Sequence, residues 1–93
     1  MPALRLMIFG RVQGVGYRAF VAEEGRRLGV TGWVRNRSDG SVEAVVSGDG
    51  RAVAAMLAAC RRGPRFSAVE RIEEEPCEEA AGGFEIRPTQ YST

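Results

Sequence analysis

Hydrophobic and polar residues alternate near the start of the chain and then change to a longer period. Residues 4–9 carry leucine or isoleucine at every second position, a spacing typical of a strand. From Tyr17 onward, hydrophobic residues recur at helical spacing and charged residues occupy another face. Because Gly29 follows this second pattern, we predict a strand over 4–9 and a helix that begins at Tyr17 and ends at Gly29.

The remainder of the chain shows the same two patterns, separated by turn residues. Asp39-Gly40 is a typical tip of a β-hairpin, and Asp49 is a typical N-cap for a second helical pattern. Gly63-Pro64 ends that helix. The strands predicted here cover residues 30–37, 41–47, 68–74 and 84–86, with a loop at 78–83 and a frayed tail at 90–93.

The order strand, helix, strand, strand, helix, strand is the split βαβ arrangement. We therefore predict an α+β, ferredoxin-like split βαβ sandwich, in which an antiparallel sheet of four to five strands carries two helices on one face. A chain of 93 residues can bury one modest two-layer core, so we expect a single domain over residues 1–93.

The charge balance of the chain excludes some partners. Thirteen basic and twelve acidic residues leave a formal charge of +1, which gives no reason to expect nucleic acid or a membrane as a partner. The first apolar run is too short for a signal peptide or a membrane span, so we expect a cytoplasmic protein. Cys60 and Cys77 lack the spacing of a zinc site, and we expect two buried, reduced thiols.

The candidate chemistry lies in the stretch at residues 10–18, G-R-V-Q-G-V-G-Y-R. Its three glycines let the backbone turn sharply, and the predicted helix begins where the stretch ends. Free N–H groups at a helix N-terminus attract anions, and the guanidinium of Arg18 can bind phosphate oxygens in a bidentate manner. The stretch can therefore form an anion-binding loop, although a plain turn with a solvated Arg18 would give the same pattern.

Two known phosphate-binding motifs are excluded. The P-loop needs a lysine, and the chain has none. Residues 14–19 match G-x-G-x-x-A, but the acidic residue that a dinucleotide site requires about twenty positions later is missing.

Three blocks of the sequence resemble the acylphosphatase family: the stretch at 10–18, G-W-V-R-N-R at 32–37 and D-G-S-V-E at 39–43. The resemblance extends over nearly the whole chain and implies the same fold. It also implies an enzyme that hydrolyses acyl phosphates to carboxylate and inorganic phosphate, without a metal or other cofactor. We expect a monomer that also accepts phosphate or sulfate as a product-like ligand.

The resemblance further assigns the site residues. Arg18 corresponds to the phosphate-binding arginine and Asn36 to the asparagine that orients the attacking water, and these two are the predicted catalytic residues. Phosphate would be held by the backbone amides and the arginine of Val12, Gln13, Gly14, Val15, Gly16, Tyr17 and Arg18. Arg37 is a departure, because some family members carry threonine after the asparagine.

The residue types present suit this reaction. The chain has no histidine, so the commonest general base and the Ser-His-Asp and Cys-His pairs are excluded. An acyl phosphate needs no acid catalyst, because its leaving group is a carboxylate whose conjugate acid has a pKa of about 4. Of the neighbouring residues, we expect Tyr17 and Trp33 to pack in the core rather than to stack on a substrate, and Gln13 to shape the turn.

Three other functions compete with this interpretation. The first is a phosphate-binding or regulatory module without catalysis, since acylphosphatase-like segments also occur inside larger carbamoyl-transferring maturation proteins. The second is an RNA-binding module of the same strand order, but the predicted strand at 41–47 carries no aromatic residue on which a base could stack. The third, a ferredoxin-like metal carrier, would need paired cysteines.

Overall fold

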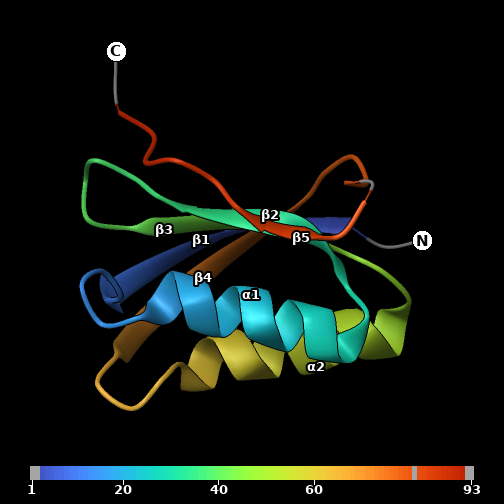
Figure 1. Cartoon of the computed structure of the whole chain (residues 1–93), viewed down its shortest axis with the longest axis horizontal. Coiled ribbons are helices and arrows are strands. Elements are labelled where there is room, and N and C mark those ends of the chain that lie inside the picture. The colour runs from blue at the N-terminus through green and yellow to red at the C-terminus, as the bar shows by residue number, and fades with distance from the viewer. Residues whose placement is uncertain (1–2, 81, 92–93) are drawn as a thin grey trace.

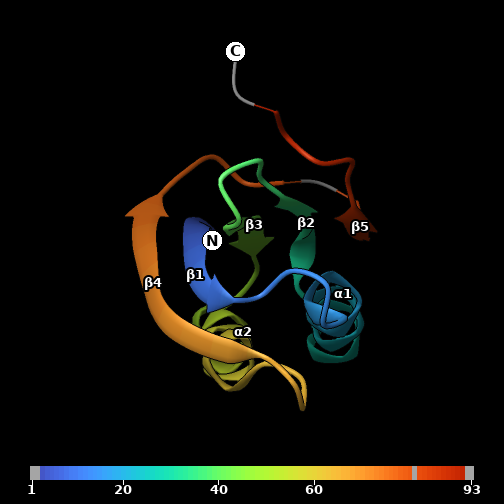
Figure 2. The same ribbon diagram turned by 90° about the vertical axis from the view of Figure 1, so that its left-hand side faces the viewer.

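Two helices lie side by side on one face of a five-stranded sheet (Figures 1 and 2). The computed structural model describes residues 3–80 and 82–91. The strands are β1 (Ala3–Arg11), β2 (Thr31–Asn36), β3 (Val42–Ser47), β4 (Ala68–Pro76) and β5 (Phe84–Ile86), and the helices are α1 (Tyr17–Leu28) and α2 (Gly50–Arg62). The predicted α+β split βαβ fold, with both helices on one face, is confirmed.

The strand order is β4-β1-β3-β2-β5. Antiparallel ladders join β1 to β3, β1 to β4 and β2 to β3, whereas β5 pairs with β2 in parallel. The sheet is therefore mixed, not wholly antiparallel as predicted. The reason is topological: the C-terminal end of β4 and the N-terminal end of β2 lie at the same end of the sheet. The connection after β4 crosses that end of the sheet and starts β5 beside the start of β2, so β5 runs in the same direction as β2.

β2 and β3 are shorter than predicted by one residue at one or both ends, and three other predicted elements differ more from the structure. β1 extends to Arg11 through a register shift at Phe9/Gly10, and β4 continues to Pro76 because its glutamates pair along β1. The predicted tail is held at Gln90, whose N–H donates to the carbonyl oxygen of Asn36 (2.8 Å). Residues 92–93 of that tail, and residue 81 of the predicted loop, lie outside the described residues.

The ends of both helices follow the predicted caps. The Asp49 carboxylate accepts a hydrogen bond from the N–H of Ala52 (2.9 Å) at the start of α2. Gly29 ends α1 in the left-handed conformation, with φ of 73°. No helix in the described part of the chain is both long and apolar enough to cross a membrane.

The core lies between the sheet and the helices. Tyr17 belongs to it as predicted, and its buried hydroxyl donates to the carbonyl oxygen of Cys60 (2.8 Å). Trp33 does not: it lies on the opposite face of the sheet, between the guanidinium groups of Arg35 (4.7 Å) and Arg87 (4.6 Å). The prediction was wrong because successive side chains of β2 point to opposite faces of the sheet. Val34 points towards the helices, so Trp33 points away from them. Both cysteines are free thiols, but only Cys60 is fully buried, while Cys77 is partly exposed.

Candidate active site

The loop between β1 and α1 ends at Gly16, which is the N-cap of α1 and has φ of 77°. This conformation costs little only for glycine. No side chain caps this end of the helix. The first hydrogen bond of the helix runs from the N–H of Phe20 to the carbonyl oxygen of Gly16 (3.1 Å). Within residues 3–80 and 82–91, no backbone carbonyl accepts from the N–H groups of residues 17–19. These donors and the positive end of the helix dipole are available to an anion.

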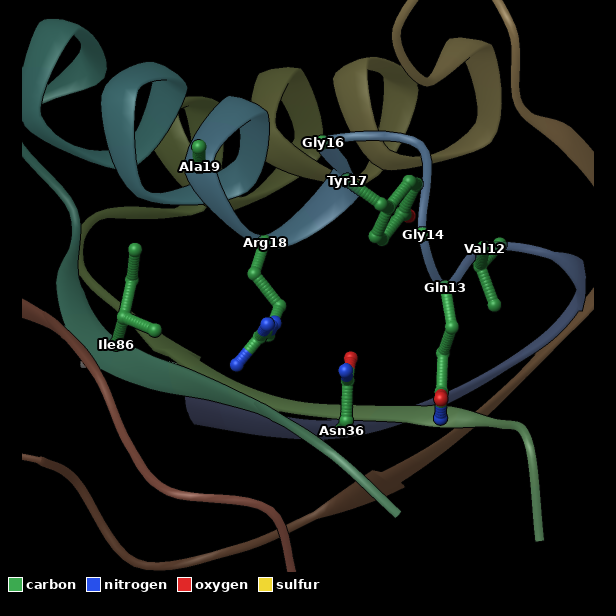
Figure 3. A pocket seen from close by; sticks show the side chains of 9 residues that line it. All are labelled: Val12, Gln13, Gly14, Gly16, Tyr17, Arg18, Ala19, Asn36 and Ile86. Atoms are coloured by element: carbon green, nitrogen blue, oxygen red, sulfur yellow. The ribbon is translucent and has the colours of Figure 1, made fainter. Parts of the chain in front are cut away.

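A cavity of about 230 Å³ opens at this helix end (Figure 3). It brings together both predicted catalytic residues and six of the seven predicted phosphate-binding residues. Val15 is the exception, because it packs against the core. The sequence did not point to two further lining residues, Ala19 and Ile86, which carry no reactive group. The lining consists of Val12, Gln13, Gly14, Gly16, Tyr17, Arg18, Ala19, Asn36 and Ile86.

Arg18 supplies the positive charge of the cavity. It lies in the first turn of α1, and its side chain extends from the helix into the cavity towards Asn36 (Figure 3). None of the ion pairs among the described residues involves Arg18. Its guanidinium donors are therefore not engaged by a carboxylate and can bind an anion.

Asn36 faces Arg18 from the end of β2 (Figure 3). Its Oδ1 is buried and has no hydrogen-bond partner among the described residues. Buried polar atoms nearly always have a partner, so an unpaired amide oxygen in a cavity marks a place for a water or a ligand. The backbone of Asn36 is fixed, because its carbonyl oxygen accepts from the N–H of Gln90 (2.8 Å).

Gln13 connects the loop to the hairpin between β2 and β3. Its Nε2 donates to the carbonyl oxygens of Arg37 and Ser41, both at 2.8 Å. These residues close the hairpin, since the N–H of Arg37 also donates to the carbonyl oxygen of Ser41 (2.9 Å). Gln13 therefore shapes more than its own turn: it ties the loop to the segment that follows Asn36.

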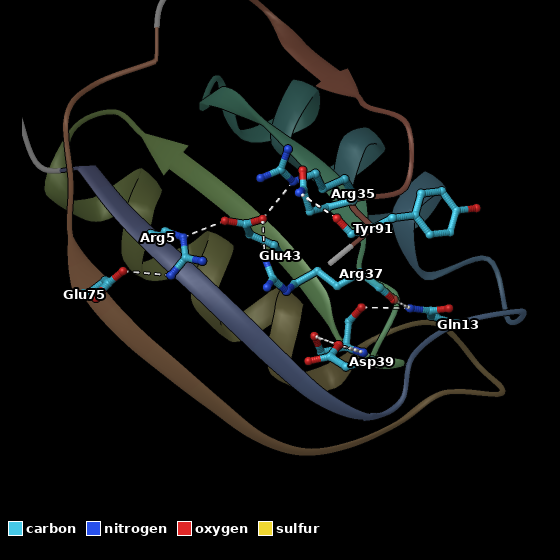
Figure 4. A network of polar contacts seen from close by, with 10 residues as sticks. Arg5, Gln13, Arg35, Arg37, Asp39, Glu43, Glu75 and Tyr91 are labelled. Carbon is cyan, nitrogen blue, oxygen red and sulfur yellow. Dashed lines mark hydrogen bonds and ion pairs between the residues drawn. The ribbon is translucent and has the colours of Figure 1, made fainter. Parts of the chain in front are cut away.

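Arg37 lies on the face of the sheet away from the helices. Its guanidinium pairs with Glu43 at 3.3 Å, and Arg5 (2.6 Å) and Arg35 (2.8 Å) bind the same carboxylate (Figure 4). Burial alone would raise the pKa of Glu43, but the hydrogen bonds from Arg35 and Arg5 outweigh burial and hold that pKa below its ordinary value. The charge that Arg37 adds next to Asn36 is therefore directed away from the cavity.

The fold and this cavity define the chain as a small α+β domain with a cationic pocket at the N-terminus of its first helix. Among the described residues, no three acidic, cysteine or histidine side chains gather to hold a metal. The acylphosphatase family model matches residues 4–86. The chain belongs to the acylphosphatase family, a family of hydrolases.

Individual relatives agree with this assignment. An acylphosphatase of Azorhizobium caulinodans is 57% identical over 88 residues, which are 92% of this chain and 95% of that protein. One from Thiobacillus denitrificans is 53% identical and covers 94% and 98%. The crystal structure of acylphosphatase from Bacillus subtilis matches with a TM-score of 0.87 at 37% identity over 94% and 99% of the two chains. Full-length HypF also matches, with a TM-score of 0.85 and 28% identity, over 97% of this chain but 12% of that one.

Proposed function

We propose that this chain hydrolyses acyl phosphates to a carboxylate and inorganic phosphate without a metal or another cofactor. The observation that carries the proposal is the pairing of Arg18 and Asn36 in one cavity. Within residues 3–80 and 82–91, the Oδ1 of Asn36 has no hydrogen-bond partner and Arg18 has no ion pair, and the free N–H groups of α1 open beside them. A reaction at a phosphoryl group would use the guanidinium of Arg18, the amide of Asn36 and the free N–H groups of α1.

In this mechanism the phosphoryl group lies against the loop. The backbone N–H groups of residues 12–18 and the guanidinium of Arg18 donate to its oxygens. The transition state of phosphoryl transfer is loose and spreads charge over the equatorial oxygens, which these fixed donors stabilise. The glycines of the loop keep side chains out of the way, so the backbone can approach the anion.

The attacking water is oriented by Asn36. Its buried Oδ1 accepts a hydrogen bond from the water and so directs a lone pair of the water oxygen at phosphorus. The bond between phosphorus and the bridging oxygen breaks, and the electron pair leaves on the carboxylate. Because the conjugate acid of this leaving group has a pKa of about 4, the carboxylate departs unprotonated at neutral pH. The water oxygen joins phosphorus with one of its protons, and its other proton passes to an oxygen of the phosphoryl group, so that inorganic phosphate forms without a phosphoenzyme and without a protein general base.

The remaining features of the proposal concern the whole chain. We propose that residues 1–93 act as one domain and as a monomer, because the loop, α1 and β2 of a single fold bring Arg18 and Asn36 into one cavity. Phosphate and sulfate would bind as product-like ligands, and neither nucleic acid nor a membrane is a partner. The free thiols of Cys60 and Cys77 support a reducing compartment such as the cytoplasm.

Two variants separate the roles of the catalytic pair. We expect Arg18→Ala to lower kcat/KM for benzoyl phosphate by about 10²-fold or more and to abolish inhibition by phosphate, because the charged donor is lost. Asn36→Ala should lower kcat by a similar factor of about 10² while the inhibition constant of phosphate changes by less than about threefold. Steady-state kinetics with phosphate titration measures both.

The matched control is Arg51→Ala, which removes an exposed arginine of α2 outside the cavity. It should leave kcat/KM for benzoyl phosphate and the inhibition constant of phosphate unchanged. An Arg18→Ala protein that still cleaves benzoyl phosphate at the wild-type rate would refute the proposal. The second candidate function, a phosphate-binding module, is supported by the match to one small part of HypF. It would hold if the wild-type protein binds phosphate but does not cleave benzoyl phosphate.

A further inference from the structure

One side of the cavity is apolar. β5 packs along α1, with Phe84 beneath Gly25 and Ile86 further towards the start of the helix, where it lines the cavity with Ala19. Phe84 is 4% exposed, whereas Ile86 is 46% exposed. The apolar stripe between β5 and α1 is therefore covered by protein at Phe84 and left open at Ile86, where the cavity begins.

The charged neighbours of Ile86 face the other side of the sheet. Glu85 pairs in register with Trp33, and the guanidinium of Arg87 lies over the Trp33 ring (4.6 Å). Alternation along a strand places the side chain of Ile86 opposite to both. Among the described residues that line this cavity, Arg18 is the charged one, and bound phosphate would neutralise it. Arg26 of α1, whose Nη2 donates to the carbonyl oxygen of Phe84 (3.0 Å), does not line the cavity, so the lining offers no second cation to an anionic acyl group.

The opposite side of the cavity is closed by a polar residue. Gln13 bridges the loop and the hairpin through its two hydrogen bonds. Figure 3 shows Gln13 on one side of Arg18 and Asn36, with Ile86 and Ala19 on the other. A substrate whose phosphate lies at Arg18 can therefore extend its second half over Ile86 and Ala19 more readily than past Gln13.

We infer that Ile86 and Ala19 form the subsite that binds the acyl group, and that this subsite favours uncharged, bulky apolar acyl groups over carboxylated ones. The inference rests on the proposed function and specifies the class of its substrate. An aromatic or branched acyl group would cover the exposed part of Ile86, which removes apolar surface from water. A methyl group, as in acetyl phosphate, is too small to cover it.

The test compares benzoyl phosphate with acetyl phosphate in the wild-type protein and in Ile86→Ala. Contact between the phenyl ring and Ile86 would bury on the order of 50 Å² of apolar surface, so Ile86→Ala should lower kcat/KM for benzoyl phosphate about fivefold to tenfold. The value for acetyl phosphate should change by less than about twofold, because that substrate does not reach the side chain. The ratio of the two values therefore reports on the subsite and not on the chemistry.

A second variant tests the charge preference by a gain of activity. Ile86→Lys places a cation in the subsite, so kcat/KM for succinyl phosphate should rise relative to benzoyl phosphate by about tenfold. The matched control is Phe66→Ala, which removes another exposed hydrophobic side chain that does not line the cavity. It should leave the kcat/KM ratio of benzoyl to acetyl phosphate and that of succinyl to benzoyl phosphate at the wild-type values.

The outcomes separate the subsite from the proposed function. An unchanged ratio of benzoyl to acetyl phosphate in Ile86→Ala, or an equal loss for both substrates, would overturn the subsite while hydrolysis itself stands. A wild-type protein that cleaves neither substrate would overturn the proposed function and the subsite with it. A fall in the ratio in Ile86→Ala that is absent from Phe66→Ala would support the subsite.

Discussion

At the scale of single residues, the glycines of the stretch at 10–18 have different tasks. Gly16 turns the backbone at the N-cap of α1, and a Cβ on it would meet no atom within 4 Å. Gly10 instead lies within β1, at the register shift beside β4, with φ of 130°. A Cβ there would overlap the carbonyl oxygen of Ala68. Sequence alone treated both as parts of one turn, because it does not show how closely β4 approaches β1.

This difference predicts two costs of substitution by alanine. Gly16→Ala should lower the free energy of unfolding by about 1 kcal/mol, because it strains only a left-handed backbone. Gly10→Ala should lower it by about 3 kcal/mol or more, because a steric clash with β4 is added to the strain. Urea unfolding of both variants measures the difference. Equal losses would contradict the assignment of Gly10 to a close contact between strands.

At the scale of elements, the site depends on the relative position of the β1–α1 loop and the end of β2. The loop carries the phosphate-binding donors, and β2 carries Asn36. The side chain of Gln13 joins the loop to the segment after β2, because its Nε2 donates to the carbonyl oxygens of Arg37 and Ser41. In the proposed mechanism the side chain of Gln13 has a positioning role: it sets the distance between the phosphate and the water without touching either, while the backbone N–H of Gln13 is one of the phosphate donors.

We therefore expect Gln13→Met, which keeps the length of the side chain but loses the donor, to lower kcat about tenfold. The inhibition constant of phosphate should change by less than about threefold, because the loop itself remains intact. In an Asn36→Ala background the same substitution should have little further effect on kcat, since the water is no longer oriented. Steady-state kinetics of the two single variants and the double variant completes this cycle.

The matched control for this cycle is Gln90→Met. In the described part of the chain, the Gln90 side chain donates to the neighbouring carbonyl oxygen of Tyr91 (3.1 Å) and not to the site, so kcat should not change. Independent, multiplying losses from Gln13→Met and Asn36→Ala would show that Gln13 does not act through the position of Asn36.

Sequence patterns predicted the helices and strands well, but predicted less well which of them lie next to one another in the fold. Alternation and helical spacing depend on nearby residues, so both helices and the strands that contribute most to the core were found. The parallel pairing of β5, the extension of β4 and the position of Ile86 depend on segments that meet only in the folded chain. For the same reason the glycines and Arg18 suggested a site, whereas Asn36 became a candidate only through the resemblance to a family.

At the scale of the whole molecule, a charge network fixes the outer face of the sheet. Glu43 of β3 lies at its centre, 4% exposed, and binds Arg5 of β1 and Arg35 of β2 (Figure 4). Arg5 also pairs with Glu75 of β4 at 2.8 Å. The network therefore spans four neighbouring strands, and its central carboxylate stabilises the fold only while it is ionised.

The lowered pKa of Glu43 predicts how stability depends on pH. Its folded pKa lies below the ordinary value of 4.5, so its contribution is present above about pH 4.5 and is lost as pH falls through the folded pKa. Glu43→Gln should lower the free energy of unfolding by about 2–3 kcal/mol at pH 7, and by less as the pH falls below 4. Urea unfolding between pH 3 and pH 7 measures this.

The matched control for Glu43→Gln is Glu70→Gln, on an exposed position of β4. It should change stability by less than about 0.5 kcal/mol at every pH. A constant difference between Glu43→Gln and the wild-type protein across this range would show that Glu43 acts through packing and not through its charge.

The position of β4 at the border of the sheet has a consequence for self-association. A long border strand offers unpaired backbone groups to a second copy of the chain, which is how fibrils begin. Here that strand carries Glu70, Glu73, Glu74 and Glu75, and charged side chains on a border strand hinder its pairing with a second copy. The charged side chains of this strand thus protect the chain against fibril growth.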